Sequence, residues 1–429
     1  MSSTGQKILE PTFEIPEIKI ILEKDANKEA VDSYKDMMGR YFPLITFGDN
    51  VIHYRSIVDF ELTVMNGYIP TFSMTVDDDD YSIRTNVDNG VTTGCCRIGY
   101  ENYRMQFKVA YTSISESGDS VYMSGRIWTP NMYKSNQKSY KNQSITDIIK
   151  SVCTDCSLGL YVYPNNDIDN VHDLIIQPNQ INYDFVTDLL LDHTQNLWCY
   201  DPYYYLHIGS LDTLMSQDVG TYTMNFADGK QYDEEHPLIF FHKMDPSSKY
   251  KGQTKEDVDS NDPERYDPSR YKIPVKRYEI NSGVGYNAFN TKRYYQLFTD
   301  KEQIDIPQRS FGMGVESSNT YSGFKSTPIP FVDLIKSKTK SREETHIFID
   351  RILPEINPLQ NIELELYLDD FKYADNKISK TDLSGYDDVH SGKRLVIGYI
   401  IRYNQIDNIL DLTNPNSGNQ LFEQEIICI

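Results

Sequence analysis

Short segments in which apolar and polar residues alternate recur along this chain, and they constrain its fold more than any other feature. Residues 361–368 place four aliphatic side chains on one face of a strand: Ile362, Leu364, Leu366 and Leu368. Residues 57–76 place two apolar runs around Asn66-Gly67, a pair that favours a tight hairpin turn in which both central residues have a positive φ. We therefore expect a β-rich protein whose sheets have one buried face and one wet face.

The first third of the chain predicts a barrel preceded by an arm. We expect a loose arm over residues 1–14, a strand at 15–23 and a short helix at 27–41. After the hairpin, three more strands are expected with no helix between them, at residues 95–99, 103–113 and 120–128. Regularly spaced strands without intervening helices are typical of a small closed or nearly closed barrel.

The pattern changes near residue 144, where helical spacing begins. Ser144 is a suitable N-cap, and Asp147 stands where a capping-box acid would lie. A strand follows this helix, and a second helix is expected from about Asn182 to His193. Residues 197–209 then read as a hairpin that turns at Asp201-Pro202. This region predicts an α+β insert.

The last part of the chain returns to strand patterns after a long polar stretch. Residues 245–271 carry almost no aliphatic side chains and predict a flexible loop, because they cannot bury a core. Residues 15–130 and 330–429 are candidates for two copies of one architecture, although no strict sequence identity links them. The predicted fold class is α+β, mostly β, with two tube-like β-barrel domains and an α+β insert. The predicted divisions are an arm and first barrel, the insert, a loop with linking strands, and a second barrel: 1–143, 144–244, 245–326 and 327–429.

Composition narrows the classes of function. The chain has 429 residues with 63 Asp and Glu against 42 Lys and Arg, a net charge of −21. Nonspecific nucleic-acid binding requires a basic face that releases counterions, so this balance argues against it. No apolar run is long enough for a membrane span, and the N-terminus has no pattern of a secretory signal. The 33 Tyr suit half-buried strands and wet interfaces.

Candidate chemical sites are few and weak. Cys153 and Cys156 form a lone C-x-x-C without the second ligand pair that zinc requires, so we interpret it as structural. Adjacent Cys95 and Cys96 would point to opposite faces of a strand and are poor ligands for one metal. The four acids at 77–80 lack the Gly and Glu of a calcium loop and predict a solvated turn. The eight histidines are scattered: His53, His172, His193, His207, His236, His242, His346 and His390.

No nucleophile elbow, phosphate loop or HExxH motif occurs, so we predict no enzyme activity, no cofactor and no catalytic or metal residue. Interface residues cannot be named from these patterns.

A likeness to a known family lies in four stretches: VYMSGRIWTP, with its central Gly, SITDIIKSVCTDCSLGL, QPNQINYDFVTDLLLDHTQNLWCYDPYYYLHIG and SGKRLVIGYIIRYN. Together they resemble the baseplate hub proteins of contractile-tailed bacteriophages. This family includes the trimeric hub of T-even phages, the late control D proteins and the N-terminal half of type VI secretion spike proteins. It spans about residues 50–429 in order. The 245–271 loop is longer and more polar than the family's, and we expect any spike or lysozyme segment to be a separate chain.

This resemblance implies two tube-like barrels per chain, with three chains forming a ring that adapts a hexameric tail tube to a trimeric spike. The implied partners are the spike protein, tail tube or tube-initiator proteins, the tape-measure protein and the baseplate wedge. DNA would pass through the channel without specific binding. The predicted location is the baseplate of the virion tail, assembled in the host cytoplasm. The alternatives are another β-rich tail or wedge component and a carbohydrate-active enzyme.

Overall fold

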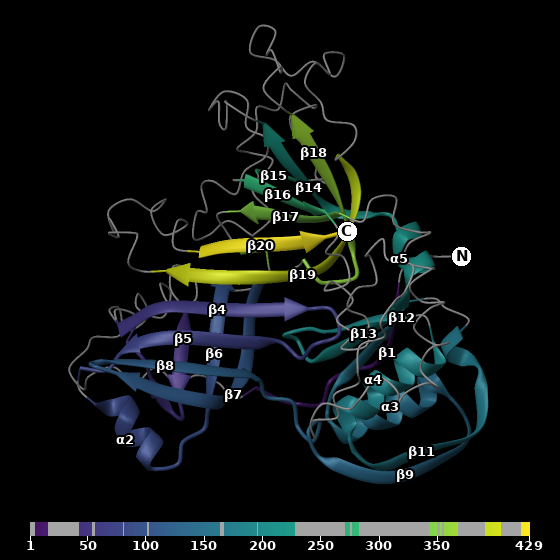
Figure 1. The fold of residues 1–429 in the computed structure, drawn as a ribbon, viewed down its shortest axis with the longest axis horizontal. Helices are drawn as coiled ribbons and strands as arrows, with labels where there is room; N and C mark the ends of the chain where they lie inside the picture. The colour runs from purple at the N-terminus through teal and green to yellow at the C-terminus, as the bar shows by residue number, and fades with distance from the viewer. Residues whose placement is uncertain are drawn as a thin grey trace, which may run out of the picture.

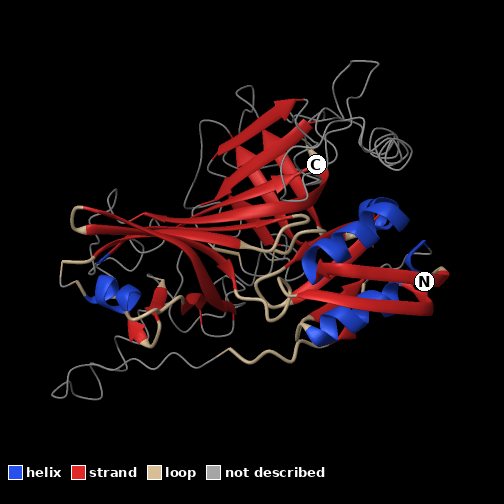
Figure 2. Ribbon diagram, turned by 60° about the horizontal axis from the view of Figure 1, so that its bottom comes forward, coloured by secondary structure: helices blue, strands red, loops and turns tan. Residues whose placement is uncertain are grey.

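A long curled sheet makes up most of the molecule, and a smaller α+β unit lies beside it (Figures 1 and 2). The computed structural model describes residues 5–15, 43–53, 56–79, 81–100, 103–163, 167–194, 196–227, 271–274, 277–282, 343–349, 352–353, 356–367, 391–404 and 422–429. The expected strand at 15–23, the helix at 27–41 and the loop at 245–271 lie almost wholly outside these residues.

Eight antiparallel strands form a ladder that runs down Figure 1. In spatial order they are β16 (Arg277–Ser282), β17 (Glu343–Ile349), β20 (Phe422–Cys428), β19 (Gly392–Asn404), β4 (Ile57–Met65), β5 (Thr71–Asp77), β8 (Ser120–Ile127) and β7 (Tyr103–Ser117). The seam between β19 and β4 joins the C-terminal strands to the N-terminal ones in a single sheet. The predicted class, mostly β with barrel-like domains, is therefore confirmed, and the two barrel regions are continuous.

The sheet contains the same strand arrangement twice. Beyond the ladder, β7 pairs with β6 (Thr93–Tyr100), then with β2 (Leu44–Phe47) and β3 (Asn50–Val51), while β19 pairs with β18 (Asn361–Tyr367), then β14 (Val219–Ala227) and β15 (Tyr271–Pro274). The spatial order β3-β2-β6-β7-β8-β5-β4 thus matches β15-β14-β18-β19-β20-β17-β16 strand for strand. We call these sets repeat 1 and repeat 2. The expectation of two copies at residues 15–130 and 330–429 gave too short a second copy, because repeat 2 also contains β14, β15 and β16, which precede residue 330.

The repeats differ at their far ends. Strand β2 runs antiparallel to β6, whereas its counterpart β14 runs parallel to β18. Repeat 1 also contains a helix, α2 (Ser82–Asp88), between β5 and β6. The prediction that no helix interrupts the first strands was wrong. Asp78, the residue after β5, stabilises this helix by accepting hydrogen bonds from the backbone N–H groups of Ile83 and Arg84.

The α+β insert follows repeat 1. Its sheet has the order β1-β10-β13-β12, made of β1 (Gln6–Leu9), β10 (Gly159–Val162), β13 (Tyr205–Ser210) and β12 (Asn196–Tyr200). Helices α3 (Ile145–Asp155) and α4 (Asn182–His193) have the predicted positions, and Ser144 and Asp147 form the predicted capping box. A ribbon of β9 (Ser135–Ser144) and β11 (Val171–Ile181) curves around these helices (Figure 1). Short η2 (Asp167–Asp169) and α5 (Leu211–Ser216) complete the unit.

The insert is fixed to repeat 1 through the predicted hairpin. Strands β4 and β5 pair as expected, but of the two turn residues only Gly67 has a positive φ, of 80°. Asn66 instead bridges to Cys199, and the amide of Gly67 donates to the carbonyl of Trp198 at 2.7 Å. The predicted turn type was therefore wrong, since the turn backbone pairs with the insert.

One glycine of the first family-like stretch has a steric reason. A Cβ on Gly125 would collide with the carbonyl oxygen of Ala110 and the ring of Phe72. This close approach accompanies a β-bulge at Thr112, where β7 carries one residue more than β8. Before the bulge, β7 pairs with β6 from Tyr103 to Ala110. After the bulge, β7 pairs with β8 and no longer with β6.

Candidate assembly interface

The ladder has one dry face and one wet face, as the alternation predicted. On β4, β5 and β8 the dry face carries fully or nearly fully buried side chains: Phe60, Leu62, Val64, Phe72, Met74, Val76, Val121 and Met123. The wet face carries Asp59, Glu61 and Thr63 on β4, and five small hydroxyl residues on β5 and β8: Thr71, Ser73, Thr75, Ser120 and Ser124. The register aligns them in rows, and Tyr122, which faces Thr75, and Arg126, which faces Thr71, lie on the same face, so this surface is polar and carries both short and long side chains.

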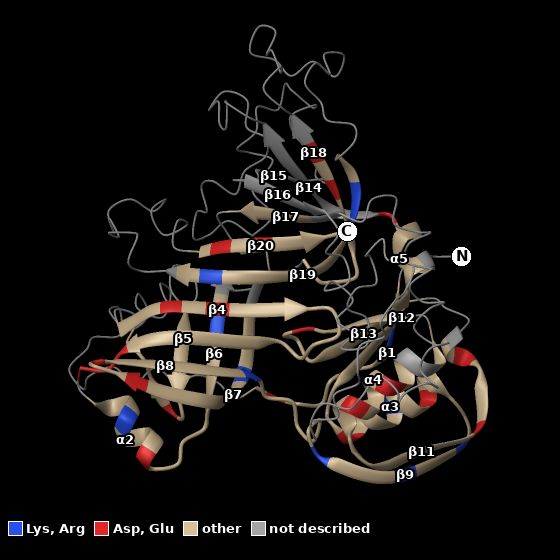
Figure 3. Ribbon diagram, viewed as in Figure 1, with Lys and Arg blue, Asp and Glu red and all other residues tan. Residues whose placement is uncertain are grey.

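A charged network crosses the wet face at the seam. Arg402 on β19 donates to Glu61 of β4 at 3.0 Å and to Glu425 of β20 at 2.5 Å. His346 of β17 contacts the other oxygen of Glu425 at 2.5 Å. Four strands from both repeats therefore meet in one chain of ionic and hydrogen bonds. Figure 3 shows the basic segment of β19 (blue) between acidic segments of β20 and β4 (red).

This network shifts the ionisation of its members. Burial on its own would raise the pKa of Glu425, but the hydrogen bonds from His346 and Arg402 outweigh it and hold that pKa below its usual range. Burial would lower the pKa of Arg402, and the contact with Glu425 outweighs it, so that pKa is raised. The carboxylate and guanidinium therefore stabilise each other in their charged forms.

Both outer edges of the ladder lack a partner among the described strands. Strand β16 pairs only with β17 there. Strand β7 pairs with β6 as far as Ala110, so its last residues pair only with β8 among the described strands. Ser113, Ser115, Glu116 and Ser117 are exposed. An open strand edge is a template for pairing with another chain.

The predicted structural role of the C-x-x-C agrees with its environment. Cys153 and Cys156 are free thiols, each at most 1% exposed, at the end of α3. Burial raises the pKa of Cys156 to about 12 and that of Cys153 well above its usual range. Cys95 and Cys96 are also buried, and burial raises the pKa of both. No group of three or more His, Cys, Asp or Glu among the described residues is arranged to hold a metal ion.

The acidic stretch at 77–80 is only partly the solvated turn that we expected. Asp78 is 1% exposed, and its carboxylate accepts hydrogen bonds from the backbone N–H groups of Ile83 and Arg84 at 2.9 and 3.1 Å. It therefore caps the N-terminus of α2. The sequence pattern did not predict this cap, because Asp78 lies five residues before Ile83, the residue whose N–H it accepts from. Asp77 is exposed and accepts from Ser120 at 2.9 Å.

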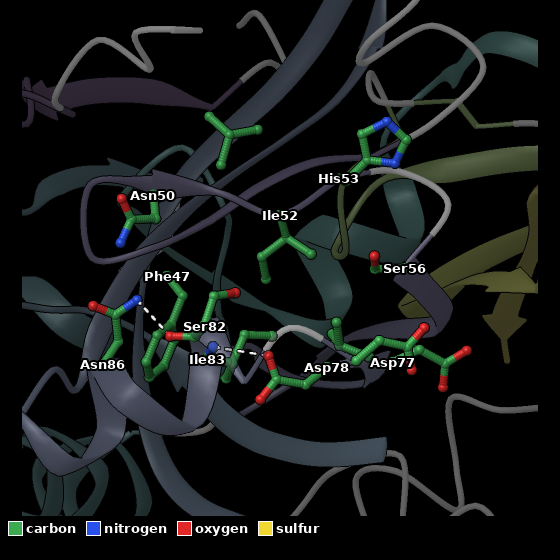
Figure 4. A pocket seen from close by; sticks show the side chains of 13 residues that line it. Phe47, Asn50, Ile52, His53, Ser56, Asp77, Asp78, Ser82, Ile83 and Asn86 are labelled. Carbon is green, nitrogen blue, oxygen red and sulfur yellow. Dashed lines mark hydrogen bonds between the residues drawn. The ribbon is translucent and has the colours of Figure 1, made fainter. Parts of the chain in front are cut away.

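A pocket of about 320 Å³ lies beside this cap (Figure 4). Its polar lining consists of Asn50, His53, Ser56, Asp77, Asp78, Asp79, Ser82 and Asn86. Both oxygens of Asp78 accept hydrogen bonds from the helix backbone, so this carboxylate has a structural role beside the pocket.

The histidines occupy separate places. His207 lies 2.7 Å from Asp201, in the hairpin that was predicted to turn at Asp201-Pro202. Asp201 also accepts from the amides of Tyr203 and Tyr205, so this pair holds the turn. His172 and His193 have ring centroids 5.0 Å apart, and His346 belongs to the seam network. His236, His242 and His390 lie outside the described residues.

Comparisons with known proteins found similarity only at the level of structure. No family model matches the chain, and no curated protein matches it. The chain is similar to a 43 kDa tail protein of prophage MuSo2 from Shewanella oneidensis, with 12% identity, 90% of this chain and 96% of that chain covered, and a TM-score of 0.48. It is similar to a tail protein from Neisseria meningitidis, with 8% identity, 90% and 95% coverage, and a TM-score of 0.45.

A third similar structure is an Escherichia coli component of the type VI secretion system, described as structurally similar to the phage T4 tail proteins gp27 and gp5. It shows 9% identity, 87% coverage of this chain and 73% of that chain, and a TM-score of 0.41. The first two of these structures are described as tail proteins and the third as a component of the type VI secretion system. No described helix is both long and apolar enough to cross a membrane.

Proposed function

We propose that the chain is a structural baseplate hub of a contractile phage tail. Three copies form a ring that connects the tail tube to the central spike and surrounds the channel for DNA and the tape-measure protein. One observation carries this proposal: each chain builds one ladder from two topologically equal repeats, and β16 and the last residues of β7, at its two edges, have no outer partner among the described strands. A trimer of such chains presents six similar units, which suits a symmetry adaptor between a hexameric tube and a trimeric spike.

The wet face of the ladder suits the wall of this channel. It carries small hydroxyl side chains on β5 and β8, and the carboxylates of Asp59 and Glu61 face the same side as Tyr122 and Arg126. The whole chain carries a net charge of −21. Negative charge repels phosphates, so DNA passes without being held.

The remaining partners follow from the same proposal. The spike protein, the tube or tube-initiator proteins and the wedge bind the ring, and the chain acts in the virion without enzyme activity after assembly in the host cytoplasm. We also propose that the chain divides after residues 143, 244 and 326 into the first barrel, the insert, the loop with linking strands and the second barrel. Strand β9 precedes the first boundary but pairs with β11 of the insert, and β14 precedes the second but pairs with β18.

The native mass of the purified chain tests this proposal. Light scattering or native mass spectrometry should give about 149 kDa, three times the 49.7 kDa of one chain, and electron micrographs should show rings. A mass of one chain at every concentration that stays in solution would contradict the hub function.

A further inference from the structure

We propose that the exposed end of β7 in one chain pairs with β16 of the next chain, in an antiparallel register that sets Ser115 opposite Asn281. This inference rests on the proposed ring and names the strands that close it. It follows from the internal repeat, because the molecule already contains one example of the same junction.

The two repeats can be aligned residue by residue through their bulges. In repeat 2 the extra residue is Ile397, since Val396 faces Cys428 and Gly398 faces Ile427. In repeat 1 the extra residue is Thr112, since Tyr111 faces Gly125 and Ser113 faces Ser124. Strand β19 after its bulge therefore corresponds to β7 after its bulge, so that Gly398 is equivalent to Ser113 and Ile400 to Ser115.

The neighbouring strands confirm this alignment independently. Leu395 faces Asn361, the first residue of β18, and its equivalent Ala110 faces Thr93, the first residue of β6. The bulge toward β20 or β8 and the start of β18 or β6 lie on opposite edges of β19 and β7. Both give the same residue-by-residue alignment of β19 with β7.

The ladder extends the alignment to β4 and β16. Ser124 faces Ser73, which faces Glu61. In repeat 2, Ile427 faces His346, which faces Glu279. Glu61 is thus equivalent to Glu279, and two residues further along Thr63 is equivalent to Asn281.

The seam inside the chain supplies the register. There β4 lies against β19, with Ile400 opposite Thr63 and Arg402 opposite Glu61. The equivalent residues of repeats 1 and 2 are Ser115 opposite Asn281 and Ser117 opposite Glu279. Strand directions alternate along the whole ladder, so β16 of the next chain meets β7 in the antiparallel sense that the seam has.

Burial differs in the way this pairing requires. In the seam, Gly398, Tyr399 and Ile401 are buried. Their equivalents on β7 are exposed or half-buried, because no described strand covers them. These β7 side chains are mostly Ser and Glu, which keep an open edge soluble before the chains meet. Such an edge would bind mainly through backbone hydrogen bonds, as in other cases of strand addition.

Cysteine cross-linking tests the register. In the double variant S115C/N281C, directly opposed Cα atoms would lie about 4.5–5.5 Å apart, within the range that a disulfide spans. The native cysteines are buried, so they should not compete. Mild oxidation should convert the variant into dimers and closed trimers on non-reducing gels. A second pair in the same register, S117C/E279C, should behave in the same way.

The matched control is S115C/I280C, which moves one cysteine by one residue and so to the other face of β16; it should stay uncross-linked. Both single variants should give no trimer. A native mass near 149 kDa without cross-linking in either predicted pair would overturn this inference and leave the hub function standing. Efficient cross-linking of the control instead would overturn the register. A single-chain mass for the unmodified protein would overturn both proposals.

Discussion

The two repeats have the same strand order, yet their corresponding strands β7 and β19 carry very different side chains. The end of β19 is covered by β4 and carries Tyr399, Ile401 and Tyr403, each at most 1% exposed. The end of β7 pairs only with β8 among the described strands and carries Ile114, Glu116 and Gly118 at the equivalent positions. The comparison shows that the two repeats keep the same strand order although their side chains differ. The end of β19, which pairs with β4 of the same chain, carries apolar side chains, and the end of β7 carries mostly polar ones.

Truncating equivalent residues on these two strands tests the comparison with the largest effect. Tyr399→Ala removes a fully buried ring from the seam and should lower the free energy of unfolding by about 3–5 kcal/mol. Ile114→Ala, at the matching position of repeat 1, should cost less than about 1 kcal/mol, because its side chain is only half-buried. Urea unfolding followed by circular dichroism measures both. Equal losses would mean that the seam and the open edge are energetically alike.

A single methyl group tests the bulge of repeat 1. Gly125→Ala places a Cβ against the carbonyl oxygen of Ala110, so the strands must separate, at a cost of about 1–3 kcal/mol. Repeat 2 carries Cys428 at the equivalent position and accommodates its side chain fully buried. Ser124→Ala, on the neighbouring wet face, is the control and should change stability by less than about 0.5 kcal/mol. If Gly125→Ala and Ser124→Ala both have the melting temperature of the wild type, the close approach to Ala110 does not explain the glycine.

Much of this fold could be predicted because its signals are local. The capping box at Ser144 and Asp147, the helix from Asn182 to His193 and the Asp201 turn all depend on residues close in sequence. The alternation of residues 361–365 predicted the buried and half-buried positions of β18. These elements were found with correct types and nearly correct bounds.

What could not be predicted depends on distant partners. Strand β9 has the sequence SNQKSYKNQS, which carries no apolar alternation, and only its pairing with β11 makes it a strand. The β4–β19 seam joins residues more than 300 positions apart, so no local pattern specifies it. Asp78 was misjudged as solvated, because a buried carboxylate needs the helix N–H groups that only the folded chain supplies.

The ionic network gives the seam a pH dependence. Because the pKa of Glu425 is lowered in the folded chain, its stabilisation is complete above the usual Glu range and is lost as pH falls through the folded value. Glu425→Gln should lower stability at neutral pH by about 1–2 kcal/mol and flatten the loss on acidification. Urea midpoints between neutral and acidic pH measure this. Glu423→Gln, whose carboxylate is 4.0 Å from Arg402, is the control and should behave almost as wild type.

Thiol labelling compares how readily the two repeats open, and it is the prediction with the smallest expected effect. In the native chain none of the six cysteines should react at neutral pH, since all are buried and burial raises the pKa of the thiols of Cys95 and Cys96. In urea below the unfolding transition, Cys95 and Cys96 should be alkylated before Cys428. Among the described strands, β6 has only short β2 on one side, through two registered pairs, whereas β20 lies between β17 and β19. Pulse alkylation with peptide mass spectrometry follows each thiol. Earlier reaction of Cys428 would show that the central seam, and not the far end of repeat 1, opens first.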